Sequence, residues 1–250
     1  MNLKASFKYQ IDEYKKSVML YYLIVILVIL FFAVSVNFTS NNHFSSQGGI
    51  EGATVIFIFV AGLNSFKETF LMLLQNGVSR KTMFFGRLAA TGILCGGMMV
   101  IDRLILAIIG LIVGDSQSFS ISGLYEEFFQ GRIESLGFLQ KNLETVLFTL
   151  CCYFMAFALG YFITTAYYRM NKLLKIAVSV GVPVSLFFIL PLVDSTITNG
   201  RIARFIGYMI RTVYGLGKDH PYNFMISSLV TTIVLFGLSW ILIRRAVDKK

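Results

Sequence analysis

The sequence predicts an all-α integral membrane protein, a single transmembrane domain over residues 1–250 with six transmembrane helices. Composition gives the first indication, because 56% of the residues are hydrophobic and only 14% are charged, whereas about a quarter of the residues in soluble domains are charged. Long uncharged runs give the second, because each is long enough for about 30 Å of hydrocarbon. The third is that basic residues gather in alternate connecting segments, as they do in multi-pass membrane proteins.

The apolar runs predict the positions of the spans, which are approximately residues 18–36, 52–74, 84–113, 146–167, 173–193 and 222–243. The first contains no charge. The third is longer than a bilayer requires at 1.5 Å per residue, so we expect it either to extend beyond the hydrocarbon or to break at Asp102 and Arg103. In the fifth, Pro183 predicts a kink.

The distribution of basic residues predicts the topology. If the N-terminus is inside, 15 of the 22 basic residues lie on the inner side: Lys4, Lys8, Lys15, Lys16, Lys67, Arg80, Lys81, Arg87, Arg169, Lys172, Lys175, Arg244, Arg245, Lys249 and Lys250. We therefore expect a multi-pass protein of the cytoplasmic (plasma) membrane with both termini in the cytoplasm. The net charge of +9 is explained by this topology, and no nucleic-acid partner is expected.

Three segments outside the spans have helical patterns. Residues 1–17 place Leu3, Phe7, Ile11 and Tyr14 on one face, which predicts an interfacial amphipathic helix with its lysines near anionic lipid headgroups. The alternative is a basic tail before the first span. The extracellular loops, residues 114–145 and 194–221, are expected to carry amphipathic helices. The helix of the second loop either dips into the outer leaflet or lies on its surface.

Residues 77–87 are the most informative segment outside the spans. Gly77 suits a helix end and Ser79 a helix N-cap. Cations and a cluster of Met and Phe follow within a few residues. This mixture predicts a short cytoplasmic helix that docks on another protein, and the alternative is an ordinary basic loop that anchors two spans.

The stretch FLMLLQNGVSRKTMFFGRL, residues 70–88, resembles the segment joining spans two and three in permease subunits of type-2 ATP-binding-cassette (ABC) exporters. That family has an interfacial N-terminal helix, six spans, a coupling helix that docks on an ATPase subunit, and an extracellular helical element between spans five and six. The order matches along nearly the whole chain, although the third run and the loop of residues 114–145 are long. The resemblance implies that the ATPase contacts Gly77, Val78, Ser79, Arg80, Lys81, Met83, Phe84 and Phe85.

The resemblance also implies the rest of the assembly. ATP and Mg²⁺ would bind the partner ATPase, with no cofactor and no metal on this chain. A second permease subunit, identical or different, would complete the path across the membrane, in contact with membrane lipids. The substrate class stays open between amphipathic peptides, lipids and hydrophobic drugs.

Asp102 and Arg103 are the charged residues inside a span, and each costs roughly 2.5–3.5 kcal/mol to insert. They project about 100° apart on a helix, so each needs its own partner or a break in the helix. Glu51, at the outer end of the second span, is a candidate partner for Arg103. A structural ion pair is the favoured interpretation over substrate chemistry. Two GxxxG pairs in the same run, Gly92 with Gly96 and Gly110 with Gly114, also suggest close helix packing.

The alternative classes of function are an intramembrane enzyme and a non-transporting sensor or assembly factor. The spacing of Glu126, Glu127 and Arg132 is one residue too long for the EExxxR motif of the intramembrane proteases that process prenylated proteins. No HExxH, no GxSxG with partners and no GxxxxGK[ST] phosphate loop occurs. The sequence therefore predicts no catalytic residue, and ATP hydrolysis is expected on a separate chain.

Overall fold

The computed structural model describes residues 3–38, 44–47, 49–113, 119–133, 136–196, 198, 200–215 and 221–244, and most of them are helical. The elements in chain order are α1 (Leu3–Phe38), β1 (Phe44–Gln47), α2 (Gly49–Asn64), α3 (Lys67–Gln75), α4 (Arg80–Val113), β2 (Phe119–Ser122), α5 (Leu124–Phe128), α6 (Gln130–Ile133), α7 (Phe138–Arg169), α8 (Lys172–Val184), the π-helical turn η1 (Ser185–Ile189), α9 (Leu190–Thr196), α10 (Arg201–Tyr214) and α11 (Tyr222–Arg244).

Six helical segments are long and apolar enough to cross a membrane: Ser6–Phe32, Gly49–Gln75, Arg80–Leu111, Phe138–Arg169, Lys172–Thr196 and Tyr222–Arg244. Their outward faces carry large apolar side chains that no described part of the chain covers, such as Leu27 and Phe31 of α1. Apolar surface of this extent is incompatible with water and is expected against lipid. The chain is therefore described as a multi-pass membrane protein, as its sequence predicts.

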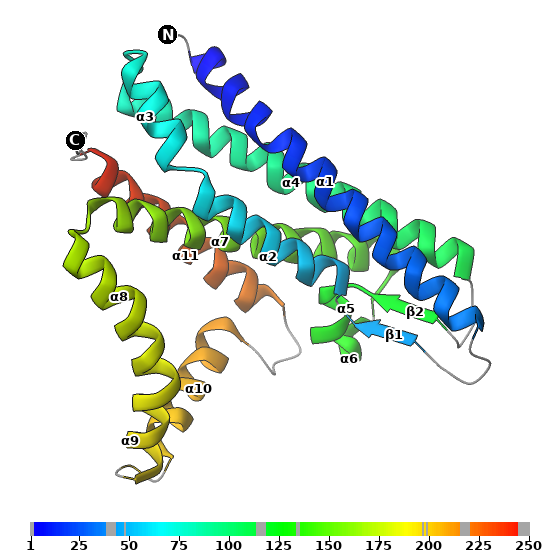
Figure 1. Ribbon diagram of the computed structural model, residues 1–250. Coiled ribbons are helices and arrows are strands. Elements are labelled where there is room, and N and C mark those ends of the chain that lie inside the picture. Colours follow the sequence, from blue (N-terminus) through cyan, green and yellow to red (C-terminus); the bar gives the residue numbers. More distant parts are fainter. Residues whose placement is uncertain are drawn as a thin grey trace.

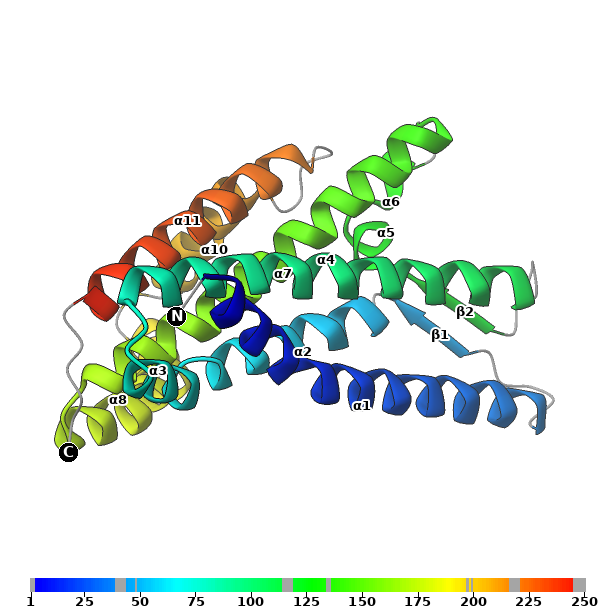
Figure 2. The same ribbon diagram turned by 90° about the horizontal axis from the view of Figure 1, so that it is seen from above.

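The helix α7 is the centre of the bundle, with α2 packed on one side and α11 on another, while α1 lies along α4 (Figures 1 and 2). The largest fully buried side chains at this centre are aromatic and include Phe148, Tyr153 and Phe157. Gly62 of α2 faces Gly160 of α7 where the two helices cross, and an added Cβ on either would collide with the backbone of the other helix. By contrast, the glycines of the predicted GxxxG pairs that the structure describes, Gly92, Gly96 and Gly110, have open space beside them.

The two ends of the bundle differ. One end holds the beginning of α1, the α3–α4 turn and the end of α11, and is called the terminal end here; the opposite end, called the strand end, holds β1, β2, α5 and α6 (Figure 1). The strands β1 and β2 pair in parallel, with Phe44 opposite Phe119. This small sheet joins the segment after α1 to the segment after α4 in a chain whose described residues are otherwise mostly helical, consistent with the all-α fold that the sequence predicts.

The helices α8 to α10 form an arm that leans away from the bundle (Figure 1). None of the side chains described in α8 is buried. Pro183 lies inside α8, and the helix widens into the π-helical turn η1 directly after it. Because proline removes a backbone donor and crowds the preceding turn, a local change of helix type is expected there.

Three helices continue through expected boundaries. The helix α1 runs unbroken past residue 17, and no Gly or Pro interrupts residues 3–38, so the predicted interfacial helix is its first part. Likewise α4 continues through Asp102 and Arg103. The helix α7 begins at Phe138, inside the loop predicted for residues 114–145. The separate short helix predicted within residues 77–87 does not form. The short helix α3 ends at Gln75, before Gly77, and α4 begins at Arg80 and continues as the third span.

Candidate functional site

The turn between α3 and α4 has the geometry that its sequence predicts. Gly77 has a φ of 69°, a left-handed conformation that glycine adopts without a Cβ penalty. The amides of Gly77 and Val78 donate to the carbonyls of Leu74 and Leu73, each at 3.0 Å, which is the Schellman arrangement of a helix end. The Ser79 Oγ then accepts from the Thr82 amide at 3.2 Å. The helix stop at Gly77 and the N-cap at Ser79 are both confirmed.

The exposure of the predicted docking residues corrects the sequence-based picture. Gly77, Ser79, Lys81 and Phe85 are exposed and Arg80 is half-buried. Val78, Met83 and Phe84, expected at an exposed docking surface, are instead buried. The reason is helical geometry: α4 begins at Arg80, so residues 83, 84 and 87 share the face that looks into the bundle.

The end of α11 is joined to this turn. The Phe84 ring packs against Trp240 and Phe236, with centroid separations of 5.1 and 6.4 Å. The Arg80 Nη1 donates to the Arg244 carbonyl oxygen at 2.6 Å. A guanidinium at that position satisfies a carbonyl that the helix leaves unpaired and complements the helix dipole. The first turn of α4 and the last turn of α11 are thus held together.

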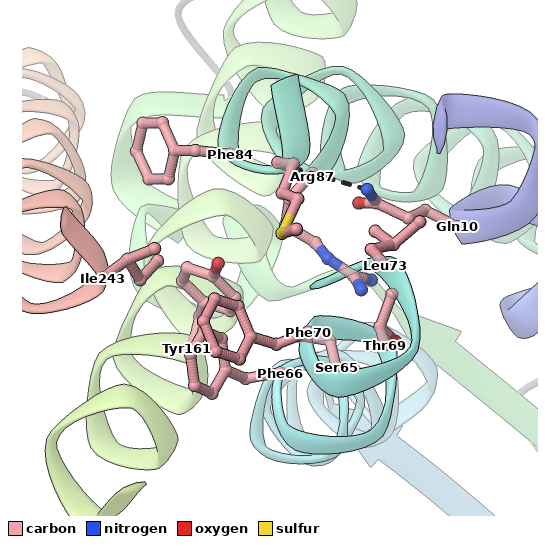
Figure 3. Close-up of a pocket in the computed structure, with 11 residues that line it drawn as sticks. Gln10, Ser65, Phe66, Thr69, Phe70, Leu73, Phe84, Arg87, Tyr161 and Ile243 are labelled. Atoms are coloured by element: carbon pink, nitrogen blue, oxygen red, sulfur yellow. Dashed lines mark hydrogen bonds between the residues drawn. The ribbon is translucent and has the colours of Figure 1, made fainter. Parts of the chain in front are cut away.

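Arg87 is the centre of a polar cluster at the terminal end (Figure 3). Its side chain is 3% exposed and donates to the Tyr14 hydroxyl and, at 3.4 Å, to Glu13 Oε2. Thr69 of α3 donates to both carboxylate oxygens of the same Glu13, at 2.9 and 3.0 Å. Breaking a buried ion pair of this kind strongly destabilises a protein. The cluster therefore fixes α1, α3 and α4 to one another.

A cavity of about 20 Å³ adjoins this cluster and is lined by Gln10, Ser65, Thr69, Arg87 and apolar side chains (Figure 3). It has room for a single water molecule. Gln10 Nε2 donates to Ser6 Oγ at 3.1 Å and to the Met83 carbonyl at 3.3 Å, while Gln10 Oε1 is buried without a partner among the described residues. From the sequence, Arg87 is predicted only as one of the basic residues on the inner side. Its burial could have been predicted from its position three residues after Phe84, on the same apolar face of the helix.

Glu51 and Arg103 form an ion pair inside the bundle, the pairing that the sequence suggested. Arg103 Nη2 lies 2.9 Å from Glu51 Oε1. Glu51 is fully buried and also accepts from the Thr149 hydroxyl at 3.3 Å and the Leu124 amide at 2.6 Å. Three donors to its two oxygens satisfy the hydrogen-bonding capacity of this buried carboxylate. Such a buried charged group with its hydrogen-bond partners is called a node, and the Glu51 node joins α2, α4, α5 and α7.

Asp102 is fully buried next to this ion pair. The Tyr153 hydroxyl donates to its Oδ2, and the Tyr22 hydroxyl lies 2.9 Å from its Oδ1 and 3.0 Å from the Met98 carbonyl oxygen. Both neighbouring charges therefore have partners, which explains why α4 does not break. No sequence pattern singles out these two tyrosines, although a buried tyrosine hydroxyl usually has a hydrogen-bond partner.

At the strand end, Glu144 accepts hydrogen bonds from four side chains, and no sequence pattern predicts this cluster. Arg132 binds it through Nε and Nη2, at 2.9 and 2.8 Å. The hydroxyls of Tyr125 and Tyr222 donate to it at 2.6 and 2.7 Å, and Gln140 at 3.1 Å. Burial, together with the adjacent carboxylate, raises the pKa of the Tyr125 hydroxyl. This node joins α5, α6 and α7 to the start of α11.

The helix α10 forms where the second outer loop predicted an amphipathic helix. Its N-terminus is capped by Asp194, which accepts from the Ile202 amide at 2.8 Å and the Ala203 amide at 3.0 Å. Phe205 and Met209 on its apolar face are exposed. The choice between the outer leaflet and its surface stays a prediction.

In the described helices of the bundle, the buried carboxylates Glu51, Asp102 and Glu144 all contact hydroxyl or cationic groups of this chain. Such an arrangement ties helices together. At the terminal end the turn between α3 and α4 exposes the polar residues Gln75, Asn76, Ser79 and Lys81. Comparison of the chain with protein-family models, with curated proteins and with solved structures finds no match.

Proposed function

We propose that this chain is the transmembrane permease subunit of a type-2 ABC exporter, with its terminal end in the cytoplasm. The observation that supports this most is the α3–α4 turn. It lies at the same end of the bundle as both ends of the described chain (Figure 1), within the stretch that resembles the family's coupling segment. Fifteen of the 22 basic residues are assigned to that side by the sequence, as the positive-inside tendency requires.

Coupling requires that a movement of the turn reaches the membrane helices. Arg87 and Glu13 connect the turn to α1, since Glu13 also binds Thr69 of α3. Arg80 connects it to the end of α11. Displacement of α3 and the start of α4 by a partner would therefore move α1 and α11 with them.

The docking surface differs in character from the one that sequence alone suggests. Its exposed members are Gln75, Asn76, Gly77, Ser79 and Lys81, and the Phe85 ring is exposed about one helical turn further along α4. The turn itself is therefore polar and basic. We propose that an acidic rim of the ATPase subunit receives it, because complementary charge steers and orients association. Met83 and Phe84 would support the turn from inside this chain.

The transport path is proposed between this chain and a second permease subunit, identical or different. The uncovered apolar face of α8, with Leu173 and Ile176 exposed, offers surface for that subunit or for lipid. The path would serve a substrate of amphipathic or hydrophobic character, such as a peptide, a lipid or a drug.

The test is purification of the chain from its native membrane and assay of the co-purifying ATP hydrolysis, in the wild type and in Lys81→Glu. We expect charge reversal at Lys81 to reduce the co-purified ATPase by about tenfold, the equivalent of about 1.4 kcal/mol. Lys172→Glu is the matched control, because Lys172 is an exposed lysine at the start of α8 and lies outside the turn. Absence of an ATPase from the wild-type preparation would refute the exporter proposal, whereas equal recovery in both variants would refute only the docking surface.

A further inference from the structure

Asp102 and the described side chains around it include two carboxylates, Asp102 itself and Glu51, but only one cation. Tyr21 and Tyr22 face it from α1, Glu51 and Thr54 from α2, and Tyr153 from α7. The one cation of this group, Arg103 on its own helix, is paired with Glu51. Among the described residues, no lysine, arginine or histidine forms an ion pair with Asp102.

An unpaired carboxylate in a dry interior is costly, and such groups take up a proton instead. Asp102 has no exposed surface, and it lies well inside a helix that is long and apolar enough to span a membrane.

The hydrogen-bond geometry accommodates a proton on Asp102. The Tyr22 hydroxyl has one proton but lies within hydrogen-bond distance of two acceptors, the Met98 carbonyl oxygen at 3.0 Å and Asp102 Oδ1 at 2.9 Å. With Asp102 ionised, that single proton is shared between them. With a proton on Oδ1, Asp102 donates to Tyr22, Tyr22 donates to Met98, and Tyr153 donates to Oδ2. Every donor and acceptor of this chain of contacts is then satisfied.

We propose that Asp102 is a proton-binding site, a neutral carboxylic acid that links α1, α4 and α7. Separation of α1 from α4 and α7 would admit water to this carboxyl. Because an aspartate in water ionises at about pH 3.9, that separation would release one proton at neutral pH. The bundle would thus open more readily as the pH rises. This property does not depend on the partner ATPase or on transport.

Infrared spectroscopy of the purified protein at neutral pH tests the proposal. We expect a carbonyl-stretch band of a protonated carboxylic acid that is absent from Asp102→Asn. Asp12→Asn, which changes an exposed aspartate paired with Lys15, is the matched control and should retain the band. In Tyr153→Phe the band should move to higher frequency, because the carbonyl oxygen loses its donor. The proposal is overturned if the band is missing from the wild type, persists in Asp102→Asn or stays in place in Tyr153→Phe.

The pH dependence of unfolding gives a second readout. If the native state alone holds this proton, the folding equilibrium constant falls by about tenfold for each pH unit above the range where aspartate ionises in water. Asp102→Asn can accept from Tyr153 and donate to Tyr22 as the neutral acid does, so it should fold but lack this part of the pH dependence. Identical pH profiles for the wild type and Asp102→Asn would contradict the proposal.

Discussion

The crossing of α2 and α7 offers a sharp test of the structure through the substitution Gly160→Ala. The added methyl group would collide with the Phe59 carbonyl oxygen and lie 2.9 Å from the Leu63 amide nitrogen and 3.1 Å from the Gly62 carbonyl carbon. All three atoms belong to the backbone of α2. No side-chain rotation can make room, so the two helices must move apart.

The expected magnitude follows from two opposing effects. Overpacking of a tight interior typically costs about 1–3 kcal/mol, and the upper value applies where backbone meets backbone. Separation also weakens dispersion contacts along the interface, because a gap of about 0.5–1 Å forfeits a quarter to a half of each contact. Alanine offsets about 1 kcal/mol through its better helix propensity. We therefore expect a net loss of about 2 kcal/mol.

Gly92→Ala is the matched control. Gly92 lies in a helix that also spans the bundle, and an added Cβ there would meet nothing within 4 Å. Only the helix-propensity effect remains, so this variant should be as stable as the wild type or more stable by up to about 1 kcal/mol. Gly62→Ala should resemble Gly160→Ala, and the double variant should cost less than the sum because both methyl groups widen the same crossing.

The assay is thermal unfolding of the detergent-purified protein, monitored by loss of the folded peak in size-exclusion chromatography. A net loss of about 2 kcal/mol corresponds to a midpoint lower by about 4–8 °C for a chain of this size. If Gly160→Ala and Gly92→Ala have the same unfolding midpoint, the close approach of α2 and α7 is not present in the folded protein. If Gly92→Ala is instead the destabilised variant, the predicted GxxxG face of α4 is a packed interface, within the chain or with a second copy.

Three further outcomes are expected from the same assay or from labelling. Arg87→Leu removes the partner of Glu13 and should lower the free energy of unfolding by about 3 kcal/mol. This is the lower end of the range for breaking a buried ion pair, because Glu13 is partly exposed. An equal loss in Arg80→Leu would contradict a central role for Arg87. Gly77→Ala places a Cβ in a left-handed conformation and should cost about 1–2 kcal/mol, and an unchanged midpoint would mean that the turn adopts another conformation. A cysteine introduced at position 79 on a background lacking the three native cysteines should resist an impermeant thiol reagent added outside intact cells, and its labelling would invert the proposed topology.

The sequence predicted the features that depend on local patterns. Six apolar segments, the stop at Gly77 and the cap at Ser79 follow from hydropathy and from the conformational preferences of single residues. The helix over residues 201–214 follows from its amphipathic pattern. These signals survive because lipid and the backbone impose the same constraints whatever the tertiary neighbours are.

The features that the sequence missed depend on contacts between distant residues. From its position beside cations, Phe84 is predicted to be an exposed aromatic residue. Only the position of α11 in the structure shows that Trp240 packs against it. The pairing of β1 with β2 joins segments about 75 residues apart, and neither strand has a distinctive pattern. The close approach at Gly62 and Gly160 involves single glycines, whereas the conspicuous GxxxG pairs that the structure describes have open neighbours. Spacing within one helix says how close a partner can come but does not identify that partner.

The positions of the polar nodes indicate which part of the molecule can move. The Arg87, Asp102, Glu51 and Glu144 nodes hold α1, α2, α4, α7 and α11 together at several depths. The buried carboxylate of the arm formed by α8, α9 and α10, Asp194, binds groups of the arm itself rather than of the bundle. The links between the described parts of the arm and the bundle lie near the two ends of the arm. At one end the Tyr167 and Ser179 hydroxyls are 3.1 Å apart. At the other, Tyr214 packs on Phe224 with ring centroids 5.8 Å apart, and Ser227 donates to the Val213 carbonyl oxygen.

An arm attached near both ends and exposed between them can swing without breaking a buried ion pair, whereas separation of any two bundle helices breaks at least one interior contact. Low-stability motions are therefore expected in the arm first. Displacement of the α3–α4 turn acts on the bundle through Arg87 and Arg80, at the same end of the molecule as the α7–α8 turn (Figure 1). In the proposed exporter, a partner bound at the terminal end would thus change the angle between the bundle and the arm while leaving the interior of the bundle intact.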